Sequence, residues 1–186
     1  TTSFTTTVNE FTYSFAEGAV GTFFDTDITL ANPATTNAPL TIDFLPESGG
    51  TLSLTTNAAA QSPLQVPVDA HVLSGSPSTV VHSTDGVPLA AERTMIWDAT
   101  GYGGHGSTST APAKRWLFAE GSQGFFDTYV LLANDNTTAA DATVRFLLEG
   151  GGVVNVSVNI PAKSRHTMYA GDTLALRGQS FGIDVR

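Results

Sequence analysis

Three short stretches decide the organisation of this chain: Phe118-Ala-Glu-Gly121, Phe125-Phe-Asp-Thr128 and Leu132-Ala-Asn134. Nearly the same series occurs once before, as Phe15-Ala-Glu-Gly18, Phe23-Phe-Asp-Thr26 and Leu30-Ala-Asn32. The two copies lie 102 or 103 residues apart, so the repeating unit has the size of a domain and not of a short solenoid turn. The sequence therefore predicts a tandem repeat of two domains.

The composition narrows the classes of partner. The chain has 186 residues, 13% of them charged, a net charge of −9 and no cysteine. An acidic surface repels nucleic acid and anionic membranes, so neither is expected as a partner. Disulfides and thiolate metal sites are excluded. No apolar run approaches the length of about 18 residues that a membrane span needs, and the sequence has no charged-then-apolar start, so neither a membrane span nor a signal peptide is expected.

Short alternating segments, separated by Gly, Pro and Asn, predict an all-β fold. Leu40 to Leu45 and Val87 to Trp97 are examples, and no segment keeps a helical period with caps at both ends. We expect two tandem β-sandwich domains of the Ig-like or jelly-roll type. The expected divisions are an N-terminal extension at 1–12, domain 1 at 13–97, a Gly/Ser/Thr linker at 98–113 and domain 2 at 114–186.

Domain 2 is expected to lack its last strand. In the first copy the segment Val87 to Trp97 follows the strand near His82 and closes the domain. In the second copy the sequence reaches Phe181 to Arg186, which matches the region around Pro77 to His82, and nothing that corresponds to Val87–Trp97 follows. The first residues of the chain meanwhile alternate as an extra strand, with Thr2, Phe4, Thr6 and Val8 on one face.

The repeated motifs of both copies resemble a repeat module of about 100 residues from secreted and cell-surface bacterial proteins. Two further stretches share this resemblance, Ala91-Glu-Arg-Thr-Met-Ile-Trp97 and Pro161-Ala-Lys-Ser-Arg165. The match covers almost everything from Tyr13 to Arg186, and the module's Ala-Glu-Arg strand occurs only in the first copy. The resemblance implies a β-sandwich and an extracellular structural or adhesive role. It offers no catalytic residues.

Two charges of domain 1 form a candidate structural pair. Glu17 precedes the glycine of the first motif and Arg93 lies in the closing strand, so a salt bridge between them would lock the last strand to the first. The alternative is that both are independent surface charges. If the pair forms, the equivalent Glu120 has lost its partner and needs another, with Arg165 and Arg186 as candidates.

Other candidate sites have simpler explanations. Asp25, Asp27, Asp127 and Asp135 offer oxygen ligands for calcium, but Asp at strand ends more often caps turns. Repeated aromatics such as Phe23 and Phe125 either form a sugar-stacking platform or belong to the core. Asn136 and Asn155 fit the glycosylation pattern. No set of residues points to catalysis, since Glu47 and Glu149 lie at equivalent positions of separate domains, so a non-enzymatic protein is expected.

A sandwich without its last strand exposes a hydrophobic slot and unpaired backbone groups, and a strand from a neighbour can fill them. The sequence therefore predicts a secreted protein that assembles head to tail into a filament or surface layer, with Thr1 to Val8 as the donor strand. The alternative is an adhesive or glycan-binding spacer module, cut from a longer cell-surface protein whose next residues supply the strand.

Overall fold

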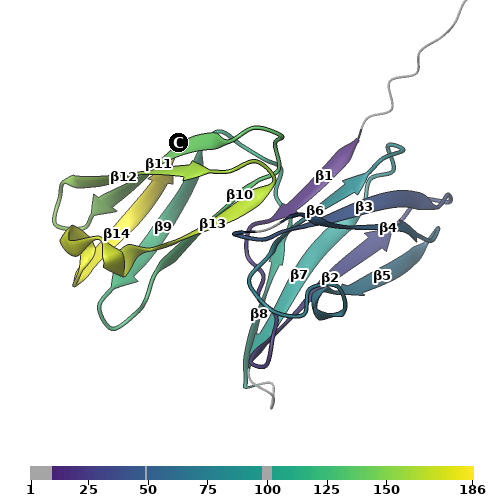
Figure 1. The fold of residues 1–186 in the computed structure, drawn as a ribbon, viewed down its shortest axis with the longest axis horizontal. Helices are drawn as coiled ribbons and strands as arrows, with labels where there is room; N and C mark the ends of the chain where they lie inside the picture. The colour runs from purple at the N-terminus through teal and green to yellow at the C-terminus, as the bar shows by residue number, and fades with distance from the viewer. Residues whose placement is uncertain (1–9, 49, 98–101) are drawn as a thin grey trace, which may run out of the picture. The chain divides into compact units, whose positions relative to one another are not determined.

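The structure, a computed structural model, describes residues 10–48, 50–97 and 102–186. The chain is all-β and divides into two compact units, unit 1 at Thr1–Ala111 and unit 2 at Pro112–Arg186. Each unit consists of two layers of antiparallel strands (Figure 1). The expected β-sandwich class is therefore confirmed. Within the described residues, no helix is long and apolar enough to cross a membrane.

Unit 1 has two four-stranded sheets. The first has the order β1-β6-β3-β4, with strands at Phe11–Phe15, Ser78–Ser83, Ala38–Leu45 and Leu52–Ala58. The second has the order β5-β2-β7-β8, with strands at Ser62–Pro67, Phe24–Asn32, Ala90–Trp97 and Gly103–Thr108. One short 3₁₀ turn, Val68–Ala70, follows β5.

Unit 2 repeats the first of these sheets and only half of the second. Its four-stranded sheet has the order β12-β11-β14-β9, with strands at Val153–Ile160, Ala140–Leu148, Gln179–Val185 and Trp116–Gln123. Its other sheet contains β10 (Tyr129–Asn134) and β13 (Ser164–Tyr169). Two 3₁₀ turns, Ala170–Asp172 and Leu174–Leu176, lead from β13 toward β14.

The polar residues of the repeated motifs form the same hydrogen bonds in both units. Thr26 Oγ1 donates to the carbonyl of Ala19 and accepts from its N–H, and Thr128 makes both bonds with Ser122. Asn32 donates to the carbonyls of Thr36 and Ala58, and Asn134 donates to those of Thr138 and Ile160. Because a buried polar group is stable only when it is hydrogen-bonded, these positions fix the loops of each sandwich.

Each unit has its own core between its two layers. The alternating strand patterns turn Ile28, Leu30, Ile42 and Phe44 inward in unit 1, where all four are fully buried. In unit 2, Val144 and Phe146 of the strand that corresponds to β3 are equally buried. Leu132, the residue of unit 2 that is equivalent to Leu30, is only partly buried.

The predicted boundaries need two corrections. The stretch 98–113 is not simply a linker, because its residues 103–108 form β8, which pairs with β7 and belongs to unit 1. The glycines that resemble a linker have a packing role there: a Cβ on Gly103 would meet the Trp97 ring at 2.5 Å. The extension 1–12 is also too long, since β1 begins at Phe11 and pairs with β6 from that residue on.

Candidate assembly interface

The difference between the units leaves one strand edge uncovered. In unit 1, β2 pairs with β5 on one side and with the closing strand β7 on the other. In unit 2, β10 pairs with β13, and the edge that corresponds to the β7 side has no partner strand within the described part of the chain. We call this the open edge. Backbone N–H and C=O groups on such an edge are available to another strand.

A phenylalanine of unit 2 is also exposed where its equivalent in unit 1 is buried. Phe15 on β1 is 4% exposed and packs in the core with Leu89 and Ala91, which belong to the closing segment. The equivalent Phe118 on β9 is 49% exposed. The two residues hold the same position in their sheets. Phe15 faces Thr79 and Phe118 faces Ile183, which are equivalent residues of β6 and β14. The ring of Phe118 is thus exposed in a unit where, among the described residues, no strand lies in the place of β7.

The expected ion pair of unit 1 is formed across the closing strand. Arg93 lies on β7 with its side chain 2% exposed, and its Nη2 is 3.0 Å from Oε2 of Glu17. Nη2 also donates to Ser107 Oγ at 3.1 Å and lies 3.3 Å from His105 Nδ1, so β8 contributes two further polar groups. Burial lowers the pKa of Arg93, and the negative charge of Glu17 opposes that shift.

Glu120 holds the place of Glu17 in unit 2, but it has no ion pair among the described residues. It lies exposed on β9. Neither arginine considered for it takes the role of Arg93. Arg165 is buried on β13 opposite Ala133, and Arg186 pairs with Asp184 at 2.9 Å. A strand that filled the open edge as β7 does in unit 1 would pass this carboxylate.

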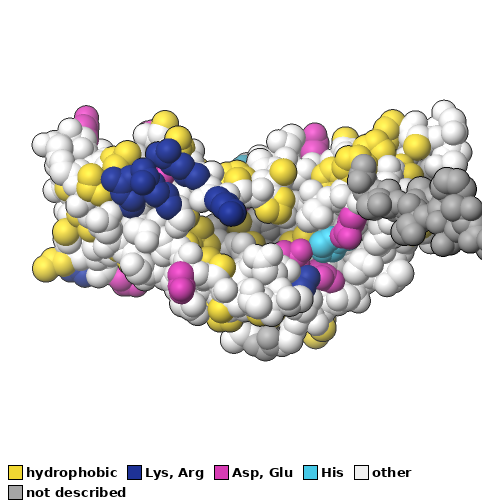
Figure 2. Space-filling view, turned by 90° about the horizontal axis from the view of Figure 1, so that it is seen from above, with side chains coloured by type: hydrophobic (Ala, Val, Ile, Leu, Met, Phe, Trp, Pro, Cys, Tyr) yellow, Lys and Arg dark blue, Asp and Glu magenta, His cyan; other side chains and the backbone are white. Residues whose placement is uncertain are grey.

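A cluster of charged side chains that the sequence analysis did not predict lies on the outer face of the four-stranded sheet of unit 2. Three arginines surround the buried Asp184: Arg115 and Arg145, with nitrogens 2.9 and 2.7 Å from the carboxylate, and Arg186. Figure 2 shows Lys and Arg side chains, in dark blue, gathered over this unit. Hydrogen bonds from Arg115 and then Arg186 hold the pKa of the Asp184 carboxyl well below its usual range.

The four aspartates considered for calcium are not brought together as one ligand set. Asp25 and Asp27 lie on β2 of unit 1, and Asp27 accepts a hydrogen bond from Gln65. In unit 2, Asp127 and Asp135 lie beyond opposite ends of β10. Asp127 accepts from Tyr169 at 2.7 Å, which raises the pKa of that phenol, and Asp135 pairs with Lys163 at 2.7 Å. These contacts are typical of structural carboxylates.

Several repeated aromatics are surface residues and not core. Phe125 is 96% exposed, and Phe23 and Phe126 are more than half exposed. Each of the two Phe-Phe pairs packs edge to face, with ring centroids 4.9 Å and 5.0 Å apart. The interpretation of the repeated aromatics as core residues holds in part for Trp116, which packs against the core of unit 2, and fails at these loop positions. Asn136 and Asn155 are both exposed as well.

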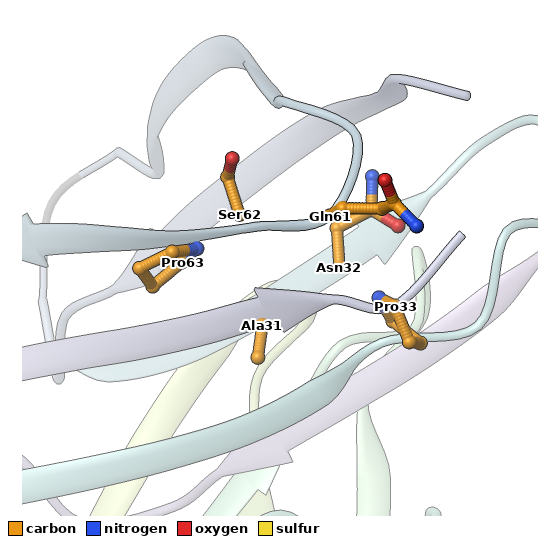
Figure 3. Close-up of a pocket in the computed structure, with 6 residues that line it drawn as sticks. All are labelled: Ala31, Asn32, Pro33, Gln61, Ser62 and Pro63. Carbon is orange, nitrogen blue, oxygen red and sulfur yellow. The ribbon is translucent and has the colours of Figure 1, made fainter. Parts of the chain in front are cut away.

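One shallow hollow of about 370 Å³ lies in unit 1 where β2 ends and β5 begins (Figure 3). Its lining comes from Ala31, Asn32, Pro33, Gln61, Ser62 and Pro63. The side chain of Asn32 is already committed to the carbonyls of Thr36 and Ala58. The lining contains no charged group, so it offers surface contact and no acid–base chemistry.

The proposed donor residues Thr2, Phe4, Thr6 and Val8 lie outside the described residues. No protein-family model and no curated protein matches the chain. Among solved structures, one described as the crystal structure of Thermotoga maritima 1070 is similar to this chain, with a TM-score of 0.48 and 13% sequence identity. The similarity covers 53% of this chain and 91% of the chain in that structure.

Proposed function

We propose that this protein is an extracellular structural subunit that assembles head to tail by β-strand donation. The observation that carries the proposal is the open edge of β10, where unit 1 has β7 on the equivalent strand. A strand from a neighbouring subunit would pair with this edge and cover Phe118. The donor surface and the acceptor surface are different, so a contact between two subunits leaves one donor and one acceptor surface free. Repetition of the contact therefore gives a filament or layer.

The closing strand of unit 1 describes the occupant that this slot fits. On β7, Ala91, Arg93 and Met95 point inward and are buried, while the residues between them point outward. A donor for unit 2 therefore needs period-two alternation with apolar or small inward residues. The N-terminal segment has that pattern, with Phe4, Thr6 and Val8 on one face, and we assign it as the donor.

Two variants of the N-terminal segment test this assignment. Phe4→Asn with Val8→Asn places polar groups on the proposed inward face, and Thr5→Asn with Thr7→Asn is the matched control on the other face. We expect the first pair, and likewise deletion of residues 1–10, to abolish filaments in negative-stain microscopy, and the second pair to leave them intact. Filaments from the deletion variant would overturn the donor assignment.

The intact mass of the protein purified from its source tests the same proposal independently. A native chain that continues beyond Arg186 with a segment like β7 would fill the open edge from within. In that case strand donation is wrong.

The exposed aromatics favour a second candidate, an adhesive or glycan-binding spacer module. Phe125, Phe126 and Tyr129 are all exposed, and the ring of Tyr129 stacks on Tyr169 with the ring centroids 5.0 Å apart. Flat exposed rings are suited to stacking on sugars. Pull-down with insoluble polysaccharides, using Phe125→Ala with Tyr129→Ala as the comparison, tests this function. Equal retention of both proteins, or of neither, counts against it.

A further inference from the structure

We infer that the Arg115–Arg145–Arg186 cluster of unit 2 docks on the acidic outer face of unit 1 in a second copy of this chain. This inference rests on the proposed head-to-tail assembly and adds a second contact to it. It names the surfaces that would orient one subunit on the next, beside the donated strand.

Charge is divided unequally between the units. Residues 1–111 contain ten of the seventeen acidic residues and one of the eight Lys and Arg residues, which gives a net charge of −9. Residues 112–186 contain seven of each, a net charge of zero. Two copies of unit 1 placed together repel each other, whereas the neutral unit 2 against unit 1 adds no net repulsion. The division therefore disfavours contact between two copies of unit 1 and permits head-to-tail contact.

The arginine cluster concentrates positive charge within unit 2. Three guanidinium groups share the single carboxylate of Asp184, so the group carries an excess of two positive charges. Arg115 and Arg186 are exposed, and each guanidinium has more N–H groups than this carboxylate can accept. Like charges held this closely are stabilised when a further anion binds.

The fold itself does not require this cluster. Arg145 faces Asp184 across the β11–β14 pair, and the same pair of positions in unit 1 holds Asp43 and Val80. Unit 1 thus forms the equivalent sheet without the arginines. Phe44 in unit 1 and the equivalent Phe146 in unit 2 are both buried in the core. The core is therefore the same at this position, and the different charged residues on the outer face of unit 2 call for an explanation outside the fold.

The outer face of the β5-β2-β7-β8 sheet in unit 1 supplies the complementary surface. Asp25 and Asp27 on β2 and Glu92 on β7 all point away from the core, because the residues that alternate with them are buried. Glu92 faces Thr29 and Asp27 faces Thr94, which places the three carboxylates on two adjacent strands. Asp25 and Glu92 are exposed and have no ion pair within the described residues. Carboxylates are the groups that guanidinium binds best.

The experiment compares the assembly of the full chain and its variants by sedimentation at NaCl concentrations from about 50 mM to about 500 mM. Over this range the electrostatic screening length falls from more than about 10 Å to less than about 5 Å. In Arg115→Gln with Arg186→Gln, Arg145 still pairs with Asp184. The control is Arg177→Gln, an exposed arginine of the same unit that donates to the carbonyl of Gly171. Asp25→Asn with Glu92→Gln tests the other surface.

At low salt we expect both double variants to raise the concentration needed for assembly by about tenfold and Arg177→Gln to leave it within about twofold. High salt should bring the wild type to the level of the variants. Assembly that depends on residues 1–10 but not on salt or these side chains would overturn the inference and leave strand donation standing. A wild-type chain that does not assemble under any condition overturns both.

A third result would assign the cluster to another partner. If the arginine variant assembles normally but no longer binds an acidic polysaccharide such as polygalacturonate, the cluster serves a polyanion and not a second copy. Thermal unfolding of each variant, within about 3 °C of the wild type, shows that a lost contact is not a lost fold.

Discussion

Unit 1 and unit 2 form the same four-stranded sheet in the same strand order, and they differ in the layer that covers it. Unit 1 covers its sheet with four strands, whereas unit 2 has two. The consequences are local: Phe118 is exposed where Phe15 is buried, and Glu120 has no arginine where Glu17 has Arg93. One half of a repeat can therefore serve as the internal reference for what the other half lacks.

The largest effect is expected when unit 2 is given a segment like the one that closes unit 1. Val185 corresponds to Val81, so a second copy of Ser83–Trp97 added after Arg186 would continue unit 2 as β7 continues unit 1. We expect this chain to remain monomeric in sedimentation and to lose filaments entirely. The same extension with Ala91, Arg93 and Met95 changed to Asp is the control. Filaments from the first chain would show that the open edge takes no part in assembly.

Matched phenylalanine substitutions should separate the two cores. Phe15→Ala empties a buried site and should lower the free energy of unfolding of unit 1 by about 3–5 kcal/mol. Phe118→Ala removes a ring that is already half in water and should cost unit 2 about 1 kcal/mol in the monomer. Urea unfolding followed by tryptophan fluorescence measures both losses of stability. Trp97 reports on unit 1 in a Trp116→Phe background, and Trp116 reports on unit 2 in a Trp97→Phe background. Equal losses would contradict the difference in burial.

The two glutamates allow a smaller version of the same comparison. Glu17→Gln leaves the buried guanidinium of Arg93 without its countercharge and should destabilise unit 1 by about 1–2 kcal/mol, because Glu17 itself is partly exposed. Glu120→Gln should change unit 2 by less than about 0.5 kcal/mol. The same fluorescence assay applies. A large loss at Glu120 in the monomer would mean that it already has a partner there.

The smallest difference is expected in the response to acid. Asp184 has a lowered pKa in folded unit 2, so its contribution to stability is complete above its unfolded pKa of about 3.9 and is lost as the pH falls toward the folded value. Asp184→Asn should remove this dependence. Unfolding of each protein between about pH 6 and pH 2 tests it. A gap between the two that stays constant below about pH 4 would argue against the shift.

The sequence predicted the β-sandwich class, which the structure confirms, because the alternation that indicates strands recurs along the chain. It failed where a contact overrides local composition. Gly103 and its neighbours resemble a linker, yet pairing with β7 under Trp97 makes them a strand. The cluster on Asp184 was missed because Arg115, Arg145 and Arg186 are far apart in sequence, and only strand register brings them to one carboxylate.

The hydrogen bonds of Asn134 and Thr128 have a consequence for how tightly a strand can bind. Both tie the loops at the ends of β10 to its own unit, through Thr138, Ile160 and Ser122, and neither bond involves the closing segment. In the proposed assembly, the edge of unit 2 that accepts the strand would therefore be preformed and would need no ordering when the strand binds. Since the entropy lost on binding then falls almost wholly on the incoming segment, even a short strand can be held for long times.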